Sequence, residues 1–419
     1  MPNSRWSTLK LGDAGEWLSG GTPSKVESDL WSGLIPWVSP KDMKRPRIGD
    51  AEDHVHESAI GNGTRLVPPS TLLMVVRGMI LAHTFPVAMT TQSVAFNQDI
   101  KALIPSKEFL PEFLLYWLQD SQRDVLQLVD IANHGTKRLA TERLFALDLP
   151  CPPLPEQKKI AAILSSVDET IAKTEAVIAQ LQIVKKAMME QLLTKGMPGR
   201  HTRFKQTEIG EIPEEWEVVE LGVVTTRITK GESPNWQGFA YQDQGTVFVT
   251  SENVRDGFLL LDPLKFVPIE FANKVRRSRL ASGDILVNLV GASIGRACIW
   301  SGEFLDANVN QAVAVISPEK TLVHSRWILE MLYTAHGQRY FGLSKVDSAR
   351  PNVSLANLRE FPLPLPSLAE QSEIVGIAAS LVESMRLEER ALKCLQSLKT
   401  ALSSSLLSGE LRVIPEVAE

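Results

Sequence analysis

The chain has 419 residues, with 44 Lys and Arg against 49 Asp and Glu, which gives a formal net charge of −5. A hydrophobic share of 44% and a charged share of 22% are typical of a globular protein and exclude a largely disordered or fibrous chain. Three widely separated cysteines without a CxxC pair exclude a disulfide framework and a cysteine-rich zinc module, and they favour a reducing cytoplasm.

The ends and the apolar segments predict the location of the protein. The opening MPNSRWSTLKLGD has no continuous apolar stretch, and no segment approaches the about 18 uninterrupted apolar residues of a membrane span. We therefore expect a cytoplasmic protein with no signal peptide and no membrane contact. The length predicts two or three domains.

The sequence contains an internal duplication. Trp6-Ser-Thr-Leu-Lys-Leu-Gly12 aligns with Trp216-Glu-Val-Val-Glu-Leu-Gly222, and Asn97-Gln98 aligns with Asn310-Gln311. Leu149-Pro-Cys-Pro-Pro-Leu-Pro-Glu-Gln157 aligns with Leu363-Pro-Leu-Pro-Ser-Leu-Ala-Glu-Gln371. The offset between the copies rises slowly from 210 to 214 residues and never reverses, as a duplicated unit with small loop insertions requires.

Each copy begins with a mixed domain. Short apolar runs such as 72–76, 285–290 and 312–316 are separated by Gly, Pro and Asn, which predicts short strands, and 112–118 and 326–332 predict internal helices. The fold class is therefore α+β, with a first domain at 1–150 and a linker plus a second domain at 199–365. Residues 200–215 are expected to be the linker.

A long helix follows each domain, at 151–198 and 366–410, with a tail at 411–419. Each helix is entered through a proline-rich strip that forces an extended approach. Glu156 and Glu370 fall in the first turns, where the helix dipole favours a carboxylate. Apolar residues recur at a 3–4 spacing over more than four heptads, which predicts a coiled coil. The seam comprises Ile160, Leu164, Val167, Ile171, Ile178, Leu181, Met188 and Leu192, and Ile374, Leu381, Met385, Leu392, Leu395, Leu402 and Leu406.

Both seams become polar at the same two steps, Thr174 with Glu388 and Lys185 with Lys399. Polar seam residues cost stability but fix register and orientation. Alternatively, these four residues lie at the edge of the seam and only their stems are covered. The sequence leaves the two interpretations open.

No catalytic constellation is evident in the sequence. The dipeptide Gly-Lys never occurs, which excludes a P-loop, and Gly291-Ala-Ser-Ile-Gly295 is interpreted as a tight hairpin. His54 and His56 lack further ligands that would complete a metal site, so a solvated loop is expected there. Asp148 with Glu156 resembles a nuclease pair only superficially, because prolines separate them. The sequence therefore predicts neither a metal site nor catalysis by this chain.

Basic residues are clustered, and clusters of this kind attract phosphates. Polar loop residues such as Asn133, His134, Asn235, Gln237, Gln242 and Gln244 are of the types that reach base edges. The clusters are Lys41, Lys44, Arg45 and Arg47 in the first copy, Lys274, Arg276, Arg277 and Arg279 in the second, and Lys137 with Arg138 and Lys345 with Arg350 ahead of the proline strips.

The chain resembles a specificity subunit of a Type I restriction–modification system. The strongest part is the proline strip ending in Glu156-Gln157 that leads into Ile160-Ala-Ala-Ile-Leu164, repeated around Glu370-Gln371. Further likeness lies in Gly20-Gly-Thr-Pro-Ser24. Two departures are Thr229-Lys-Gly-Glu-Ser-Pro234, a degraded copy of that element, and Asn288-Leu-Val290, which lacks the arginine that Arg77 supplies.

The resemblance implies two target-recognition domains that each read half of a bipartite DNA target. It also implies that the two long helices pair as an antiparallel coiled-coil rod, which holds the domains apart. It implies a non-catalytic subunit that docks methyltransferase subunits, two in number, and restriction subunits. It places S-adenosylmethionine, and ATP with Mg²⁺, on those partners, whose complex methylates adenine N6 and cleaves DNA. Arg77 joins the candidate DNA contacts. A coiled-coil scaffold whose domains bind protein, and a free-standing DNA enzyme, are the alternatives.

Overall fold

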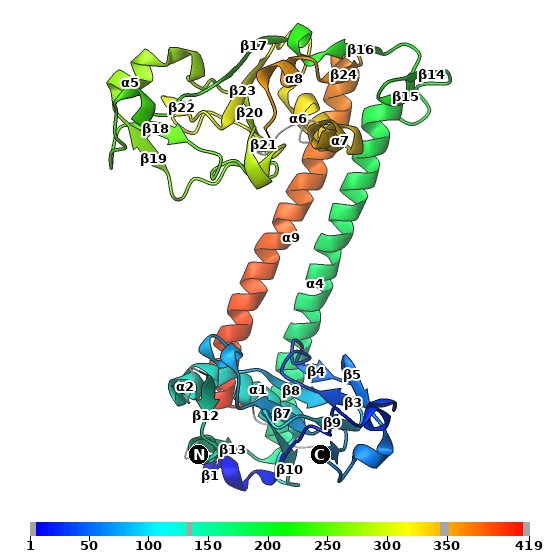
Figure 1. The fold of residues 1–419 in the computed structure, drawn as a ribbon, viewed down its shortest axis with the longest axis vertical. Coiled ribbons are helices and arrows are strands. Elements are labelled where there is room, and N and C mark those ends of the chain that lie inside the picture. Colours follow the sequence, from blue (N-terminus) through cyan, green and yellow to red (C-terminus); the bar gives the residue numbers. More distant parts are fainter. Residues whose placement is uncertain (1–5, 132–135, 344–351, 414–419) are drawn as a thin grey trace. The chain divides into compact units, whose positions relative to one another are not determined.

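The computed structural model describes residues 6–131, 136–343 and 352–413, and it divides into two compact units (Figure 1). Unit 1 comprises Met1–Ala176 with Arg390–Glu419, and unit 2 comprises Val177–Glu389. Each unit therefore holds one copy of the mixed domain together with part of both long helices. The fold class is confirmed: the domains are mixed helix and sheet, and the long helices pack together.

Unit 1 is built on a five-stranded sheet in the order β2-β10-β7-β8-β4 and a four-stranded sheet in the order β5-β3-β9-β6. The strand β7 is fully buried at the centre of the larger sheet, which explains its unbroken apolar sequence. The strands are β1 Ser7–Lys10, β2 Gly15–Ser19, β3 Ile35–Val38, β4 Arg47–Ile48, β5 Asp53–Val55, β6 Arg65–Val67, β7 Leu72–Val75, β8 Val87–Thr90, β9 Val94–Phe96, β10 Ile100–Pro105, β11 Val129–Ile131, β12 Lys137–Leu139 and β13 Asp148–Cys151.

Short helices cover the larger sheet of unit 1. Helix α1 contributes six consecutive buried residues, from Phe113 to Leu118, to the same core as β7. The helices are α1 Pro111–Asp120, α2 Gln122–Gln127 and α3 Thr141–Phe145, with 3-10 turns η1 Leu11–Asp13, η2 Ser28–Trp31, η3 Glu57–Ala59 and η4 Met79–Ala82. The smaller sheet has its own core around Trp37 and Val55.

Unit 2 repeats this plan with a four-stranded sheet, β17-β23-β20-β21, and a three-stranded sheet, β19-β18-β22. The strands are β14 Phe204–Thr207, β15 Gly210–Pro213, β16 Glu217–Glu220, β17 Thr225–Lys230, β18 Thr246–Val249, β19 Lys265–Val267, β20 Ile285–Asn288, β21 Ala297–Ile299, β22 Ala307–Val309, β23 Val313–Pro318 and β24 Pro362–Leu365. The helices are α5 Ile269–Lys274, α6 Ser325–Tyr333, α7 Ala335–Leu343 and α8 Leu355–Arg359, with η6 Leu221–Val224, η7 Asn235–Gln237, η8 Arg276–Ser278 and η9 Gly291–Ser293.

The long helices α4, Leu154–Lys195, and α9, Leu368–Ser408, run side by side in opposite directions (Figure 1). In unit 1 the beginning of α4 shares a core with the end of α9, through Ile160 and Leu406. In unit 2 the end of α4 shares a core with the beginning of α9, through Leu192 and Ile374. The pairing is therefore antiparallel.

The predicted seam follows the less exposed stripe of both helices, with one exception. Met188 is 38% exposed, whereas its neighbour Met189 is buried in the core of unit 2. The stripe shifts by one residue here because α4 packs against the mixed domain as well as against α9.

The polar seam lysines bind the mixed domains. Lys185 Nζ lies 3.4 Å from the buried Glu330 carboxylate on α6. Lys399 Nζ lies 2.6 Å from Asp168 on α4 and 5.9 Å from the centre of the Tyr116 ring on α1. Each lysine therefore contacts a helix of the mixed domain in its own unit, α6 for Lys185 and α1 for Lys399, in addition to any role in register.

Two segments are more ordered than their sequences suggest. The proline strips form β13 and β24, which pair antiparallel with β1 and β16. Proline is tolerated there because each strand pairs with a single partner and needs few amide donors. The expected linker 200–215 contains the β14–β15 hairpin.

Candidate nucleic-acid interface

In unit 1 a buried carboxylate ties both ends of the chain to the first turn of α4. Glu156 is 3% exposed, and Trp6 Nε1 donates to its Oε2 at 3.0 Å. Arg412 donates through Nε and Nη2, each at 2.9 Å, and its guanidinium lies 5.1 Å from the centre of the Trp6 ring. We call Trp6, Glu156 and Arg412 the unit 1 clasp.

The unit 1 clasp holds its carboxylate ionised. Burial by itself raises the pKa of Glu156, but hydrogen bonds from Arg412, Trp6 and the backbone N–H of Val413 outweigh it and lower the pKa below the ordinary value. The sequence predicted only a favourable helix dipole at this position. Its side-chain partners Trp6 and Arg412 lie 150 and 256 residues away in sequence, so no local pattern signals them.

Unit 2 repeats the clasp with different basic residues. Trp216 Nε1 donates to Glu370 Oε2 at 3.2 Å, and His201 Nε2 lies 2.9 Å from Glu370 Oε1. Arg200 Nη1 lies 3.9 Å from the same oxygen. We call Trp216, Glu370, His201 and Arg200 the unit 2 clasp. In sequence, the residues after α4 close unit 2 as the residues after α9 close unit 1.

The glutamine beside each clasp carboxylate fixes a second junction. Gln157 Nε2 donates to the carbonyls of Pro152 and Glu108, both at 2.8 Å, while its Oε1 accepts from Leu110 N at 2.7 Å. Gln371 makes the same three kinds of bond to Pro366 O, Leu322 O and His324 N. The repeated Glu-Gln pair is thus structural in both units.

The first basic cluster is partly neutralised within unit 1. Lys41 Nζ lies 2.9 Å from Asp53 and 3.2 Å from Glu52, and both ion pairs raise the pKa of Lys41. Lys44, Arg45 and Arg47 are exposed along an open depression and form no ion pair with the described residues. These three side chains are therefore available to an external anion.

The second cluster is neutralised more fully. Arg277 forms an ion pair with Glu232, and Arg279 Nε lies 2.8 Å from Asp306. The Lys274 ammonium lies 5.8 Å from the centre of the Phe239 ring, and Arg276 is exposed. Only Lys274 and Arg276 of this cluster lack an acidic partner within the part of the chain that the structure describes.

The third set of cations lies at the junction of two hairpins in unit 1. The backbones of Arg77 and Arg138 form an isolated bridge, and Gly78 N donates to Lys137 O at 3.0 Å. The corresponding Lys345 and Arg350 lie outside the described residues, as do Asn133 and His134. The structure therefore brings Arg77 next to Lys137 and Arg138, from which it is distant in sequence.

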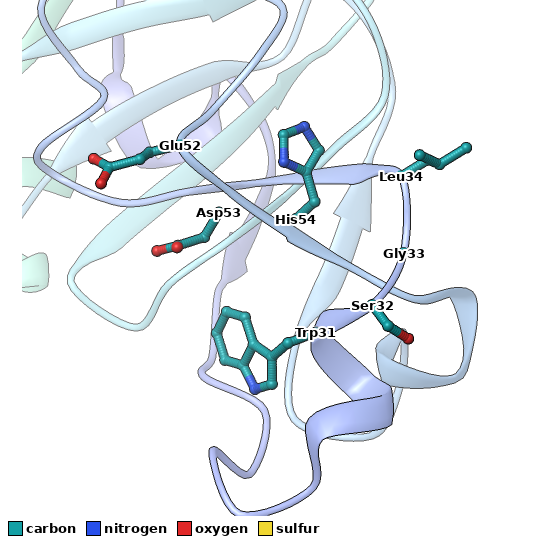
Figure 2. Close-up of a pocket in the computed structure, with 7 residues that line it drawn as sticks. All are labelled: Trp31, Ser32, Gly33, Leu34, Glu52, Asp53 and His54. Carbon is teal, nitrogen blue, oxygen red and sulfur yellow. The ribbon is translucent and has the colours of Figure 1, made fainter.

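An open depression near the first cluster has features of neither a phosphate nor a catalytic site (Figure 2). Its lining residues are Trp31, Ser32, Gly33, Leu34, Glu52, Asp53 and His54, and Leu34 points away from the others. The carboxylates of Glu52 and Asp53 pair with Lys41, and His54 Nε2 lies 2.9 Å from Asp50. No three metal-ligating side chains meet anywhere in the described ranges.

Unit 2 presents amides on an exposed loop around η7. Asn235, Gln242 and Gln244 are exposed, and Gln237 Nε2 donates to Glu232 at 2.5 Å. Trp236, between two of these amides, is 79% exposed. The sequence analysis named the amides but missed Trp236, whose exposure follows from its place on a single 3-10 turn.

No helix among the described residues is long and apolar enough to cross a membrane.

Comparison with known proteins gives a consistent picture. The family model described as "Type I restriction modification DNA specificity domain" matches residues 3–182 and 213–396. The chain is 30% identical to a putative type I restriction enzyme MjaX specificity subunit of Methanocaldococcus jannaschii, over 97% of this chain and 94% of the relative. It is 33% identical to the EcoR124I/EcoR124II specificity subunit of Escherichia coli, over 43% of this chain and 45% of that relative.

Two solved structures share the fold. One belongs to work described as the structural basis underlying complex assembly and conformational transition of the type I R-M system, and it superposes with a TM-score of 0.63 at 17% identity, over 98% of this chain and 100% of that chain. The other is the Type-I restriction-modification S subunit from M. genitalium, with a TM-score of 0.56 at 14% identity over 97% of each chain. At such identities the likeness establishes the fold alone.

Proposed function

The chain belongs to the family of Type I restriction–modification DNA specificity subunits, and we propose that its two units each read one half of a bipartite DNA target. It is a DNA sequence-recognition subunit, and specificity subunits are generally non-catalytic. The observation that carries the bipartite reading is the repeated frame: the same clasp and the same glutamine junction occur in both units. Equivalent frames present two recognition surfaces of the same type.

The recognition surfaces divide into phosphate-contacting and base-contacting parts. Lys44, Arg45 and Arg47 are proposed phosphate contacts, because they are exposed and have no acidic partner among the described residues. Lys274 and Arg276 have the same role in unit 2. Lys345 and Arg350 stay predictions.

Cations that already have acidic partners contribute less to DNA binding. Lys41, Arg277 and Arg279 must give up an internal ion pair before they contact DNA. Base reading is proposed for the exposed amides of the η7 loop, because Asn and Gln present both donors and acceptors to base edges.

The family implies assembly with methyltransferase and restriction subunits. We propose two methyltransferase subunits, one for each repeated frame. S-adenosylmethionine, and ATP with Mg²⁺, are proposed to bind those partners, and adenine methylation and ATP-dependent cleavage are proposed activities of the assembled complex. The alternative in which the domains bind protein instead of DNA is not favoured by the family match.

Salt-dependent DNA binding by the assembled methyltransferase complex tests the proposal. The triple substitution K44A/R45A/R47A is expected to weaken binding to a duplex with the methylated motif and to lower the slope of log affinity against log salt by about 3. A scrambled duplex should lose affinity in parallel, because phosphate contacts are not sequence-specific. An unchanged slope would remove this cluster from the interface.

A further inference from the structure

Unit 1 presents an exposed surface where the end of β7 meets β12. Leu139 N donates to Val76 O at 2.9 Å, and Gly78 N donates to Lys137 O at 3.0 Å. These bonds place the turn η4, which begins at Met79, directly beside the β11–β12 hairpin. Residues distant in sequence therefore form one continuous surface.

Large apolar side chains stand out from this surface. Met79 is 64% exposed, Ile80 is 37% exposed, and Ile131 on β11 is 69% exposed. Isolated exposed apolar residues are common on proteins. Met79 and Ile80 are consecutive at the start of η4, and Ile131 lies on β11, the strand paired with the neighbouring β12. Together they form a small exposed apolar patch.

Cations border this apolar patch of Met79, Ile80 and Ile131. The side chains of Arg77 and Arg138 are exposed and that of Lys137 is half-buried, and none of the three forms an ion pair with the described residues. Arg77 does act on Asp99: burial, the larger effect, raises the pKa of Asp99, and the charge of Arg77 opposes that rise. The net charge of the surface is therefore positive.

The equivalent junction in unit 2 lacks these features. Val353 N donates to Leu289 O at 2.9 Å, and Val290 forms an isolated bridge with Asn352, as Arg77 does with Arg138 in unit 1. The turn η9 that follows is Gly291–Ser293, which carries only small side chains. Val290, at 37% exposure, is the one large apolar residue at this junction that is exposed among the described residues.

We propose that Met79 and Ile80 insert between base pairs of the half-site read by unit 1, while unit 2 reads its half-site without such a wedge. The inference rests on the proposed function. Apolar side chains flanked by cations are the means by which proteins unstack and kink a duplex at one step. A DNA duplex is the favoured occupant, because the three cations beside the apolar residues form no ion pair with the described residues and complement phosphates.

Wedge insertion makes the two half-sites differ in deformability. A step that is pried open is favoured when its sequence unstacks easily, so unit 1 gains specificity at base pairs that it does not contact directly. Arg77, Lys137 and Arg138 hold the flanking phosphates and orient the apolar patch toward the duplex. Unit 2, with small side chains at the same place, is expected to read a straighter duplex.

The test uses the full chain in complex with its methyltransferase subunits and a duplex that carries the motif found by modified-base mapping. A 2-aminopurine probe is placed at each position in turn except the methylated adenine, because its fluorescence rises when the base unstacks. Wild-type protein should unstack a step in one half-site only. M79S/I80S should abolish that signal and weaken binding by roughly tenfold or more. The matched unit 2 variant V290S should change neither.

A mismatch at the unstacked step provides the rescue. A pre-opened step needs no wedge, so M79S/I80S should bind the mismatched duplex nearly as well as wild-type protein does. The wedge is overturned if unstacking survives M79S/I80S, if it is equal in both half-sites, or if M79S/I80S loses the methyltransferase subunits while V290S keeps them. The last result would identify a protein-docking surface. Failure of wild-type protein to distinguish the motif from a scrambled duplex would instead refute the proposed function.

Discussion

The two units share their internal frame and differ in their exposed surfaces. Both tie a tryptophan to the first-turn carboxylate of a long helix, and both use the next glutamine to hold the start of an internal helix. The basic partners differ: an arginine after α9 closes unit 1, whereas His201 with Arg200 closes unit 2. The buried geometry is the same in both units, whereas the exposed residues differ.

This difference indicates where specificity lies. The clasps and glutamine junctions fix the helices and sheets, and their glutamates and glutamines are buried. The surfaces built on them are an apolar turn with three cations in unit 1 and an exposed amide loop in unit 2. One frame thus supports two different readers, and changes in either component should have separable consequences.

The largest expected effect is a change of target. Inserting one heptad in α4 after Ala176 and one in α9 before Arg390 keeps the antiparallel pairing, because both helices lengthen equally. A heptad adds about 10 Å of helix, or about three base pairs of duplex. Modification at the original sites should disappear, and a map of methylated sites should show the same two half-sites with a wider gap. Any altered half-site would refute the role of the helices as a spacer.

Removing one clasp charge should destabilise one unit. Glu156→Gln leaves Arg412 without its carboxylate, and the expected loss is about 2–3 kcal/mol in unit 1 alone. Hydrogen exchange of α1 amides should accelerate while that of α6 amides stays unchanged. The matched control, Glu370→Gln, should give the reverse pattern. Equal acceleration in both units for either variant would show that the frames are not independent.

Acid should separate the wild-type protein from that variant. The lowered pKa of Glu156 means that its ionisation stabilises the folded state above the unfolded-state pKa, about 4.3, and that this stabilisation is lost as the pH falls through the lower folded-state pKa. Glu156→Gln removes this contribution, so its free energy of unfolding should depend less on pH in the acidic range. The free energy of unfolding can be measured by thermal unfolding at a series of pH values. Parallel pH dependences for the two proteins would contradict the role of the clasp.

The smallest effect is expected from the cluster that the sequence made most conspicuous. R276A/R277A/R279A should weaken DNA binding and lower the salt slope by only about 1, because Arg277 and Arg279 already pair with Glu232 and Asp306. The slope change for K44A/R45A/R47A should be about three times larger. Equal slopes for the two triple variants would mean that the unit 2 ion pairs open on binding.

Periodic and repeated features could be predicted from sequence, and pairings across long sequence separations could not. The 3–4 spacing predicted both long helices, and the duplicated motifs predicted two equivalent domains. The Glu156–Arg412 pair joins residues whose separation hides it from any local pattern. Met189 replaces Met188 in the core because packing on the mixed domain decides the buried face. Sequence analysis did not single out Met79 and Ile80, which are exposed at the start of η4.

The central claim, that this chain assigns a split DNA target to its complex, is tested most directly by a modified-base map of host DNA with and without its gene. We predict a bipartite adenine-methylated motif that is present with the gene and absent after its deletion. Substituting residues of unit 1 alone should then alter one half of that motif. A methylated motif that persists unchanged after deletion, in cells whose methyltransferase subunit is active, would contradict the account.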